Sequence, residues 1–99
     1  MAQKVIISDD ARRDLDRIFL EFIDFSEKYA LMWADEFFNY MDLLETNPKM
    51  GRIVPDVGSD NFREVFVGKY RVMYKVTNEV EIMMLRHSSK PLDFTDDDN

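Results

Sequence analysis

The chain has 99 residues, a length that suits one domain with a single core and is too short to enclose a deeply buried active site. It contains no cysteine, which excludes disulfide bonds and thiolate metal sites and suits a reducing cytoplasm. Thirteen basic and twenty acidic residues give a net charge of −7, which argues against autonomous nucleic-acid binding through phosphate contacts.

The charge is unevenly distributed along the chain. Eight lysines and arginines fall within residues 48–90, whereas much of the acid lies in the first half and in residues 93–98. A local basic face on an acidic body is therefore expected. The first residues contain only a short apolar stretch at residues 5–7, so we expect neither a signal peptide nor a membrane span, and we expect a cytoplasmic protein.

The first elements are predicted as a short strand and two helices. Residues 5–7 are apolar and β-branched, and Ser8 with the two aspartates after it can cap a helix. Apolar residues then recur at steps of three and four, which predicts two amphipathic helices. The first stripe contains Ala11, Leu15, Ile18, Phe22 and Phe25, and the second contains Ala30, Trp33, Phe37, Tyr40, Met41 and Leu44. A break at residues 26–28 and the helix-ending pair Asn47-Pro48 make the two a hairpin.

The second half is predicted as a loop followed by a three-stranded antiparallel meander. Residues 49–61 contain Pro55 and two glycines without clear periodicity, so they are expected to form a loop that presents Arg52 to solvent. The strands are predicted at residues 62–67, 70–77 and 80–87. The expected fold class is therefore α+β, with the helix hairpin on one face of the sheet and the other face open.

A two-residue turn at Asn78-Glu79 would fix the register of the last two strands. It would set Tyr74 opposite Met83 and Arg71 opposite Arg86. The face toward the helices would then hold Tyr70, Val72, Tyr74, Val76, Met83, Leu85 and His87. The open face would hold Arg71, Met73, Lys75, Ile82, Met84 and Arg86. A three-residue turn would shift the last strand by one residue and change this assignment.

Five basic side chains are the first candidates for a functional site: Arg52, Arg71, Arg86, His87 and Lys90. They are expected to gather near one end of the sheet, where arginines on rigid strands could hold a phosphate and an imidazole could move a proton near neutral pH. The alternative is that the strand arginines are solvated and pair with carboxylates such as Glu81 or Glu64, and that His87 only hydrogen-bonds a backbone group.

No metal or cofactor is expected. The carboxylates of the first helix (Asp14, Asp16, Glu21 and Asp24) are interpreted as a solvated helix face, because no clustered ligand set accompanies them. The aspartates near the C-terminus lack the alternating ligands and the glycine of a calcium loop. Trp33 and the phenylalanines at helical spacing are interpreted as core rather than as a base-stacking platform.

In order and spacing, these motifs resemble the RelE/ParE superfamily of toxins from bacterial and archaeal toxin–antitoxin pairs. The resemblance rests on Ala11-x-x-Asp14-Leu15-x-x-Ile18, Asn47-Pro48, Gly51-Arg52, Tyr70-Arg71-Val72-x-Tyr74-x-Val76, and Val80-x-Ile82 with His87. It covers nearly the whole chain, so we expect one toxin domain at residues 1–92 and an acidic, disordered tail at residues 93–99.

The resemblance implies a cytoplasmic toxin, associated with plasmid stabilisation, that a cognate antitoxin holds inactive without any cofactor. ParE-like members poison DNA gyrase by binding it, whereas RelE-like members cut messenger RNA on the ribosome with basic residues and a C-terminal tyrosine or histidine. The target- or antitoxin-binding residues would be Arg52, Arg71, Met73, Lys75, Met84, Arg86 and Lys90. In an endonuclease, Arg71 and His87 would be catalytic, since no tyrosine follows Tyr74.

Two departures favour the ParE-like branch. Many relatives carry further arginines after the terminal histidine, where this chain has Ser88-Ser89-Lys90, and the acidic composition suits a protein-directed inhibitor better than an RNA-cutting enzyme. We therefore expect a gyrase inhibitor that works by binding and is not an enzyme. A ribosome-dependent RNA endonuclease and an inactive antitoxin-binding relative are the alternatives, and the sequence leaves the antitoxin and the oligomeric state open.

Overall fold

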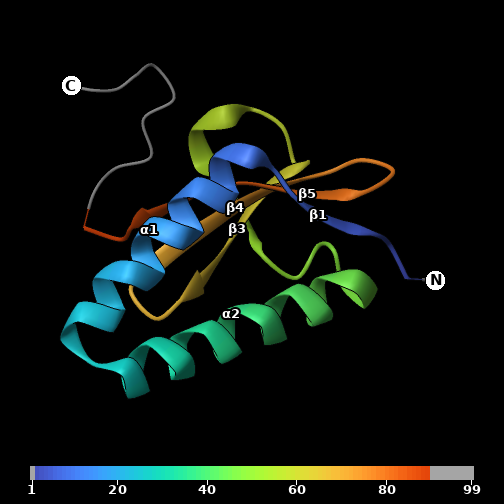
Figure 1. The fold of residues 1–99 in the computed structure, drawn as a ribbon. Helices are drawn as coiled ribbons and strands as arrows, with labels where there is room; N and C mark the ends of the chain where they lie inside the picture. Colours follow the sequence, from blue (N-terminus) through green and yellow to red (C-terminus); the bar gives the residue numbers. More distant parts are fainter. Residues whose placement is uncertain (1, 90–99) are drawn as a thin grey trace.

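The computed structural model describes residues 2–89, in which two long helices accompany one mixed sheet (Figure 1). In chain order the elements are β1 (Val5–Ile7), α1 (Asp9–Phe25), α2 (Glu27–Thr46), β2 (Arg52–Ile53), the 3-10 helix η1 (Pro55–Val57), β3 (Phe62–Val67), β4 (Tyr70–Val76) and β5 (Val80–His87). The strand order is β1-β5-β4-β3-β2, with β1 parallel to β5 and the other neighbours antiparallel. The predicted α+β fold, with its helix hairpin and meander, is confirmed. Residues 90–99, which include the predicted tail and Lys90, lie outside the described part.

The expected loop at residues 49–61 contains one short strand that the sequence did not predict. In β2, Arg52 pairs with Glu64 and Ile53 pairs with Arg63, at the edge of the sheet. Two residues are too few to show the alternation by which a strand is recognised in a sequence. Their pairing nevertheless fixes the position of Arg52 beside β3.

Serine side chains begin both helices. Ser8 Oγ accepts a hydrogen bond from Ala11 N at 3.1 Å, as the sequence predicts for the start of α1. Ser26 serves both helices, because its N–H donates to Phe22 O and its Oγ accepts from Tyr29 N at 3.1 Å. A linker of one residue therefore joins the two helices into the hairpin that is drawn in blue and green in Figure 1.

The helices bury one face of the sheet, which we call the inner face. The buried core comprises Ala11, Leu15, Ile18, Trp33, Phe37, Met41, Leu44, Val65, Val67, Val72, Tyr74, Val76, Val80, Ile82 and Leu85. These residues include most of both predicted helical stripes. Phe25 is an exception, because it is the last residue of α1 and lies next to the ring of Tyr29 at the hairpin tip, where 81% of it is exposed.

Tyr74 joins the sheet to the loop that follows α2. Its buried hydroxyl accepts a hydrogen bond from Gly51 N at 2.9 Å. A Cβ atom on Gly51 would lie 2.6 Å from both Tyr74 Oη and Glu64 O, so only glycine allows the loop to approach this closely. Arg63 holds the same loop by donating from Nη1 to the carbonyl oxygens of Lys49 and Gly51 at 3.1 and 3.0 Å. The chain is thereby fixed as it enters β2.

The predicted register of the last hairpin is confirmed at Arg71 and wrong at Tyr74. The turn has three residues rather than two, which sets Tyr74 opposite Ile82. The register then shifts at a β-bulge, in which Met83 is the extra residue, so that Arg71 still lies opposite Arg86. Ile82 is consequently buried in the core, whereas Met83 is half-buried at the bulge.

The outer edge of β5 is covered by β1 along its first part and by α1 along the rest. Asp14 Oδ2 accepts hydrogen bonds from Leu85 N and Arg86 Nη1, both at 3.1 Å, and the Asp14 side chain is only 18% exposed. The prediction that the carboxylates of the first helix are solvated is therefore wrong for Asp14. It holds for Asp16, whose side chain is 66% exposed.

Asp14 and Asp16 offer a matched pair for testing this contact. We expect Asp14→Ala to lower the free energy of unfolding by about 2 kcal/mol, because it leaves the partly buried Leu85 N–H without its acceptor and removes the carboxylate that pairs with the Arg86 guanidinium. Asp16→Ala removes the same charge from the same helix but breaks only an exposed pair, so it should cost less than about 1 kcal/mol. Denaturant unfolding of the two variants would measure the difference, and equal losses would contradict a structural role for Asp14.

Candidate functional site

The candidate site is the sheet face that points away from the helices, which we call the outer face. The strand pairings place on it Arg52, Phe62, Glu64, Phe66, Arg71, Met73, Lys75, Glu81, Met84 and Arg86. The face therefore combines four cations with methionine side chains, as predicted for the open face, and with the rings of Phe62 and Phe66, which the prediction did not include. It is less open than expected, because Met73 and Glu64 are each only 1% exposed.

Glu64 lies between two of the predicted site residues. Its Oε2 accepts a hydrogen bond from Arg52 Nε, and its Oε1 lies 4.0 Å from Arg71 Nη1. Arg52 is directly opposite Glu64 on β2, whereas Arg71 is diagonal to it on β4. A buried carboxylate thus brings the two arginines together. The pairing of Arg71 with Glu64 agrees with the alternative prediction, but its expected solvation does not, because the Arg71 side chain is only 23% exposed.

The cluster retains unused hydrogen-bonding capacity. Within residues 2–89, Glu64 Oε1 and Arg71 Nε are buried and find no hydrogen-bond partner. The Arg52 side chain, by contrast, is 59% exposed, so part of its guanidinium faces solvent. Since a buried charge is costly unless it is paired, Glu64 depends on both arginines for its place in the sheet.

Aromatic rings accompany the cations of the outer face. The Arg71 guanidinium lies 5.8 Å from the centre of the Phe66 ring, and Lys75 Nζ lies 5.6 Å from the centre of the Phe62 ring. Phe66 is 40% exposed. Aromatic rings and arginines together are typical of the energetically important centres of protein interfaces.

Arg86 and His87 are not part of the cluster around Glu64. Arg86 bends around the sheet edge to Asp14, and His87 pairs across the strands with Tyr70, whose ring centre lies 5.2 Å away. Ser89 N donates to His87 Nδ1 at 3.1 Å, which makes Nδ1 an acceptor and leaves the proton of the neutral ring on Nε2. The four first candidates that the structure describes, Arg52, Arg71, Arg86 and His87, therefore do not gather in one place.

The arrangement separates Arg71 from His87. Successive strand residues point to opposite faces, so Arg71 lies on the outer face while His87 lies on the side of Tyr70, at the inner face. His87 borders a hollow of about 280 Å³ that is also lined by Arg17, Glu21, Tyr70, Leu85 and Arg86. The cations of this hollow face carboxylates, since Arg17 pairs with Asp14 at 3.3 Å and approaches Glu21 at 3.9 Å.

A groove between α1 and α2 is the second exposed feature, and sequence reasoning missed it. It has a volume of about 510 Å³ and is lined by Ile7, Arg12, Leu15, Asp16, Phe19, Leu31, Ala34 and Phe38. Leu31 and Phe38 are half exposed, at 52% and 51%. They lie seven residues apart with Ala34 between them, so they form a second apolar stripe on α2, beside the stripe that packs in the core.

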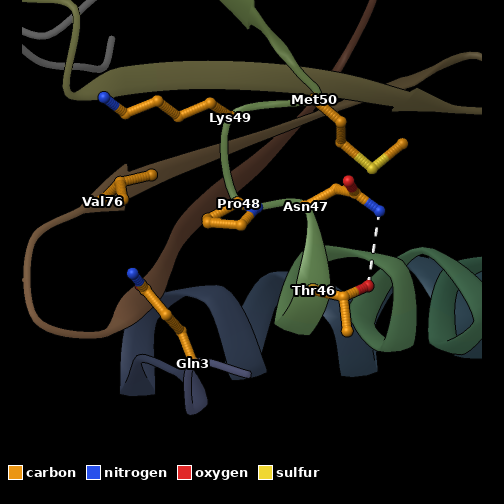
Figure 2. A pocket seen from close by; sticks show the side chains of 7 residues that line it. All are labelled: Gln3, Thr46, Asn47, Pro48, Lys49, Met50 and Val76. Atoms are coloured by element: carbon orange, nitrogen blue, oxygen red, sulfur yellow. Dashed lines mark hydrogen bonds between the residues drawn. The ribbon is translucent and has the colours of Figure 1, made fainter. Parts of the chain in front are cut away.

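A third hollow, of about 470 Å³, lies where α2 ends (Figure 2). Figure 2 shows Gln3, Pro48 and Val76 around it, and the hydrogen bond from Asn47 Nδ2 to Thr46 Oγ1 at 3.3 Å. Lys49 is the one ionisable residue among those that line it. The lining thus offers no acid–base pair.

Comparison with known proteins identifies the family. A family model described as "ParE toxin of type II toxin-antitoxin system, parDE" matches residues 5–92. A solved structure described as "Chromosomal ParDE TA system from P. aeruginosa" superposes with a TM-score of 0.70 at 16% sequence identity, over 87% of this chain and 96% of that one. The comparison with curated proteins found no match. Within residues 2–89, neither helix is long and apolar enough to cross a membrane.

Two tyrosines near these features have altered acidity. Burial raises the pKa of Tyr70 above its ordinary value of 10.0, and the nearby Glu21 raises it further. Burial also raises the pKa of Tyr74, against the smaller lowering effects of its hydrogen bond from Gly51 and of the Arg63 charge. Both phenols therefore hold their protons more firmly in the folded than in the unfolded chain.

These shifts predict how stability depends on alkaline pH. Since the folded pKa lies above the unfolded value, the contribution of each tyrosine is complete below pH 10.0 and is lost as the pH rises through the folded pKa. We expect the free energy of unfolding to fall above pH 10.0 and the decline to be shallower in a Tyr70→Phe, Tyr74→Phe double variant. Tyrosinate absorbance would follow the titration, and an unchanged late component in the double variant would assign it to other groups.

Proposed function

Because the chain belongs to the ParE toxin family of type II toxin–antitoxin systems, we propose that it is a toxin that inhibits DNA gyrase by binding and is neutralised by a cognate antitoxin. The observation that carries the proposal is the family match over residues 5–92. In this proposal the protein acts in the cytoplasm, without a cofactor and without cutting nucleic acid.

The position of His87 supports a binding mechanism over a nuclease mechanism. A general acid or base must lie within hydrogen-bond reach of the proton that it transfers, in a site that also holds the reacting phosphate. Arg71 would have to hold that phosphate on the outer face, whereas His87 lies beside Tyr70 at the inner face. The Nδ1 atom of His87 is also occupied by Ser89.

We assign target binding to the outer face. Arg52 and Phe66 are exposed there, and Arg71 is held between Phe66 and Glu64. A guanidinium that is fixed by a carboxylate and a ring loses little further freedom on binding, so more of its interaction energy contributes to affinity.

We assign antitoxin binding to the groove between α1 and α2. An apolar groove of this kind suits the apolar side of an amphipathic helix, and Arg12 and Asp16 at its border can pair with the polar side of that helix. An antitoxin that is partly disordered when free would gain order as it fills the groove.

The gyrase proposal can be tested with purified, antitoxin-free protein, gyrase, supercoiled plasmid and ATP. We expect inhibited supercoiling and trapped double-strand DNA cleavage. Arg71→Gln should weaken inhibition by about tenfold or more, as expected for a central interface arginine, whereas His87→Ala should change it by less than about twofold. Circular dichroism and unfolding transitions would show that both variants are folded.

Three outcomes separate the candidate functions. Trapped cleavage that depends on Arg71 supports the gyrase proposal. Cleavage of messenger RNA on ribosomes that is lost with His87→Ala would replace it with the endonuclease alternative. A folded protein that binds its antitoxin but affects neither target would be an inactive relative.

The groove can be tested with two adjacent residues of similar exposure. Leu31 lines the groove and is 52% exposed, whereas Met32 lies outside it and is 59% exposed. We expect Leu31→Arg to weaken antitoxin binding by about tenfold or more, because it places a charge in an apolar contact, and Met32→Arg to have little effect. Calorimetry with the purified antitoxin would measure both affinities.

The same pair also gives a cellular readout. Co-expression with the antitoxin should restore growth for the wild type and for Met32→Arg but not for Leu31→Arg. Equal neutralisation of the two variants would place the antitoxin elsewhere, whatever the target of the toxin is.

A further inference from the structure

Each cation of the outer face lies next to a carboxylate. Glu64 is shared by Arg52 and Arg71, Asp14 binds Arg86 at 3.1 Å, and Lys75 lies opposite Glu81 in the strand register. Glu64 differs from the other acids because it is only 1% exposed and lies beneath the side chains that it pairs. Its negative charge is therefore a fixed part of the surface.

The position of Glu64 changes what the two arginines can bind. Arg52 Nε already donates to Glu64, and Arg71 Nη1 faces the other carboxylate oxygen. A phosphate bound across both guanidinium groups would approach this carboxylate, which water screens poorly because it is buried. The cluster carries a net charge of +1 rather than +2 at the centre of the face.

We propose that Glu64 is a specificity-determining residue that prevents the outer face from binding the phosphate backbone of a nucleic acid. Without its charge, Arg52, Arg71 and Lys75 would form a cationic surface that carries the exposed ring of Phe66, the combination by which proteins hold single-stranded nucleic acid. With the Glu64 charge present, the outer face would bind only ligands that do not present a continuous row of anions.

The effect of Glu64 would be the same whether or not the protein inhibits gyrase, because it concerns RNA binding by the protein alone. It can therefore fail while the proposed function stands, and the reverse also holds.

The test compares two full-length variants that remove one negative charge from the same face. Glu64→Gln removes the buried charge, and Glu81→Gln removes an exposed one opposite Lys75. Fluorescence anisotropy with a short fluorescein-labelled oligouridine at low salt would measure RNA affinity. We expect Glu64→Gln to bind about tenfold more tightly than the wild type or Glu81→Gln. Its dependence on salt should be steeper by about one unit of slope, since it frees one or two phosphate contacts.

Two further variants identify the source of the gain. Adding Arg71→Gln to Glu64→Gln should return the affinity to that of the wild type. In the presence of Glu64, Arg71→Gln alone should leave the weak RNA binding unchanged. If Glu64→Gln does not fold, Glu64→Met removes the same charge with an apolar side chain of similar length.

Two results would overturn the role of Glu64. One is equal RNA binding by folded Glu64→Gln and Glu81→Gln. The other is a loss of RNA affinity when Arg71→Gln is made in the otherwise unchanged chain, because the outer face would then bind phosphate despite Glu64. The second comparison needs no substitution at Glu64, so it can overturn the role of Glu64 even if both Glu64 variants are unfolded.

Discussion

The two helices cover one face of this sheet. On the other face, the buried Glu64 carboxylate of β3 links three strands through its pairs with Arg52 on β2 and Arg71 on β4. Between residues 2 and 89, β3 and β4 each bury side chains on both faces although α1 and α2 pack on one. On the outer face, Met73 and Glu64 are each only 1% exposed, and Arg52 and Arg71 pair with the Glu64 carboxylate. The pairing thus compensates the charge of a carboxylate that is buried where no helix covers the sheet. The same carboxylate orients the two arginines, so it would also shape the surface for the proposed target binding.

The Glu64 cluster depends in turn on a close contact from the inner face. Tyr74 reaches through the core to Gly51, and the lack of a side chain at Gly51 lets the loop pass within hydrogen-bond distance of the tyrosine hydroxyl. Arg52 is the next residue along the chain, and this contact therefore places it opposite Glu64, to which it donates a hydrogen bond. The sequence pair Gly51-Arg52 therefore has a physical explanation. The glycine lets the loop approach Tyr74, and the arginine supplies the positive charge that pairs with Glu64.

The sequence was sufficient for features that repeat along the chain and insufficient for those that depend on one contact. Helical and strand periodicity predicted α1, α2, β3, β4 and β5 within a residue or two, because each pattern is repeated over several turns or pairs. Neither the bulge at Met83 nor the strand β2 is marked by a periodic pattern in the sequence. Before the bulge, the residues of β5 therefore lie on the opposite faces from those predicted. In sequence, Asp14 is indistinguishable from the exposed carboxylates near it in α1. Only its contact with the edge of β5 in the folded chain buries it. The separation of Arg71 from His87, by contrast, followed from strand alternation alone, which already assigned them to opposite faces.

The groove and the outer face lie on different parts of the molecule, which constrains how the proposed neutralisation could work. The groove between α1 and α2 is formed by the helices, whereas Glu64 and its arginines lie on the sheet face that the helices do not cover. A helix bound in the groove alone would leave Arg52 and Arg71 accessible. If the target binds the outer face, an antitoxin held in the groove must therefore either continue around the sheet edge or block a target too large to approach. For a target much larger than this domain, as the proposed one would be, bulk in the groove would be enough for the second route. An antitoxin segment that reached the arginines would need carboxylates of its own, and it would compete with the target for the same two guanidinium groups.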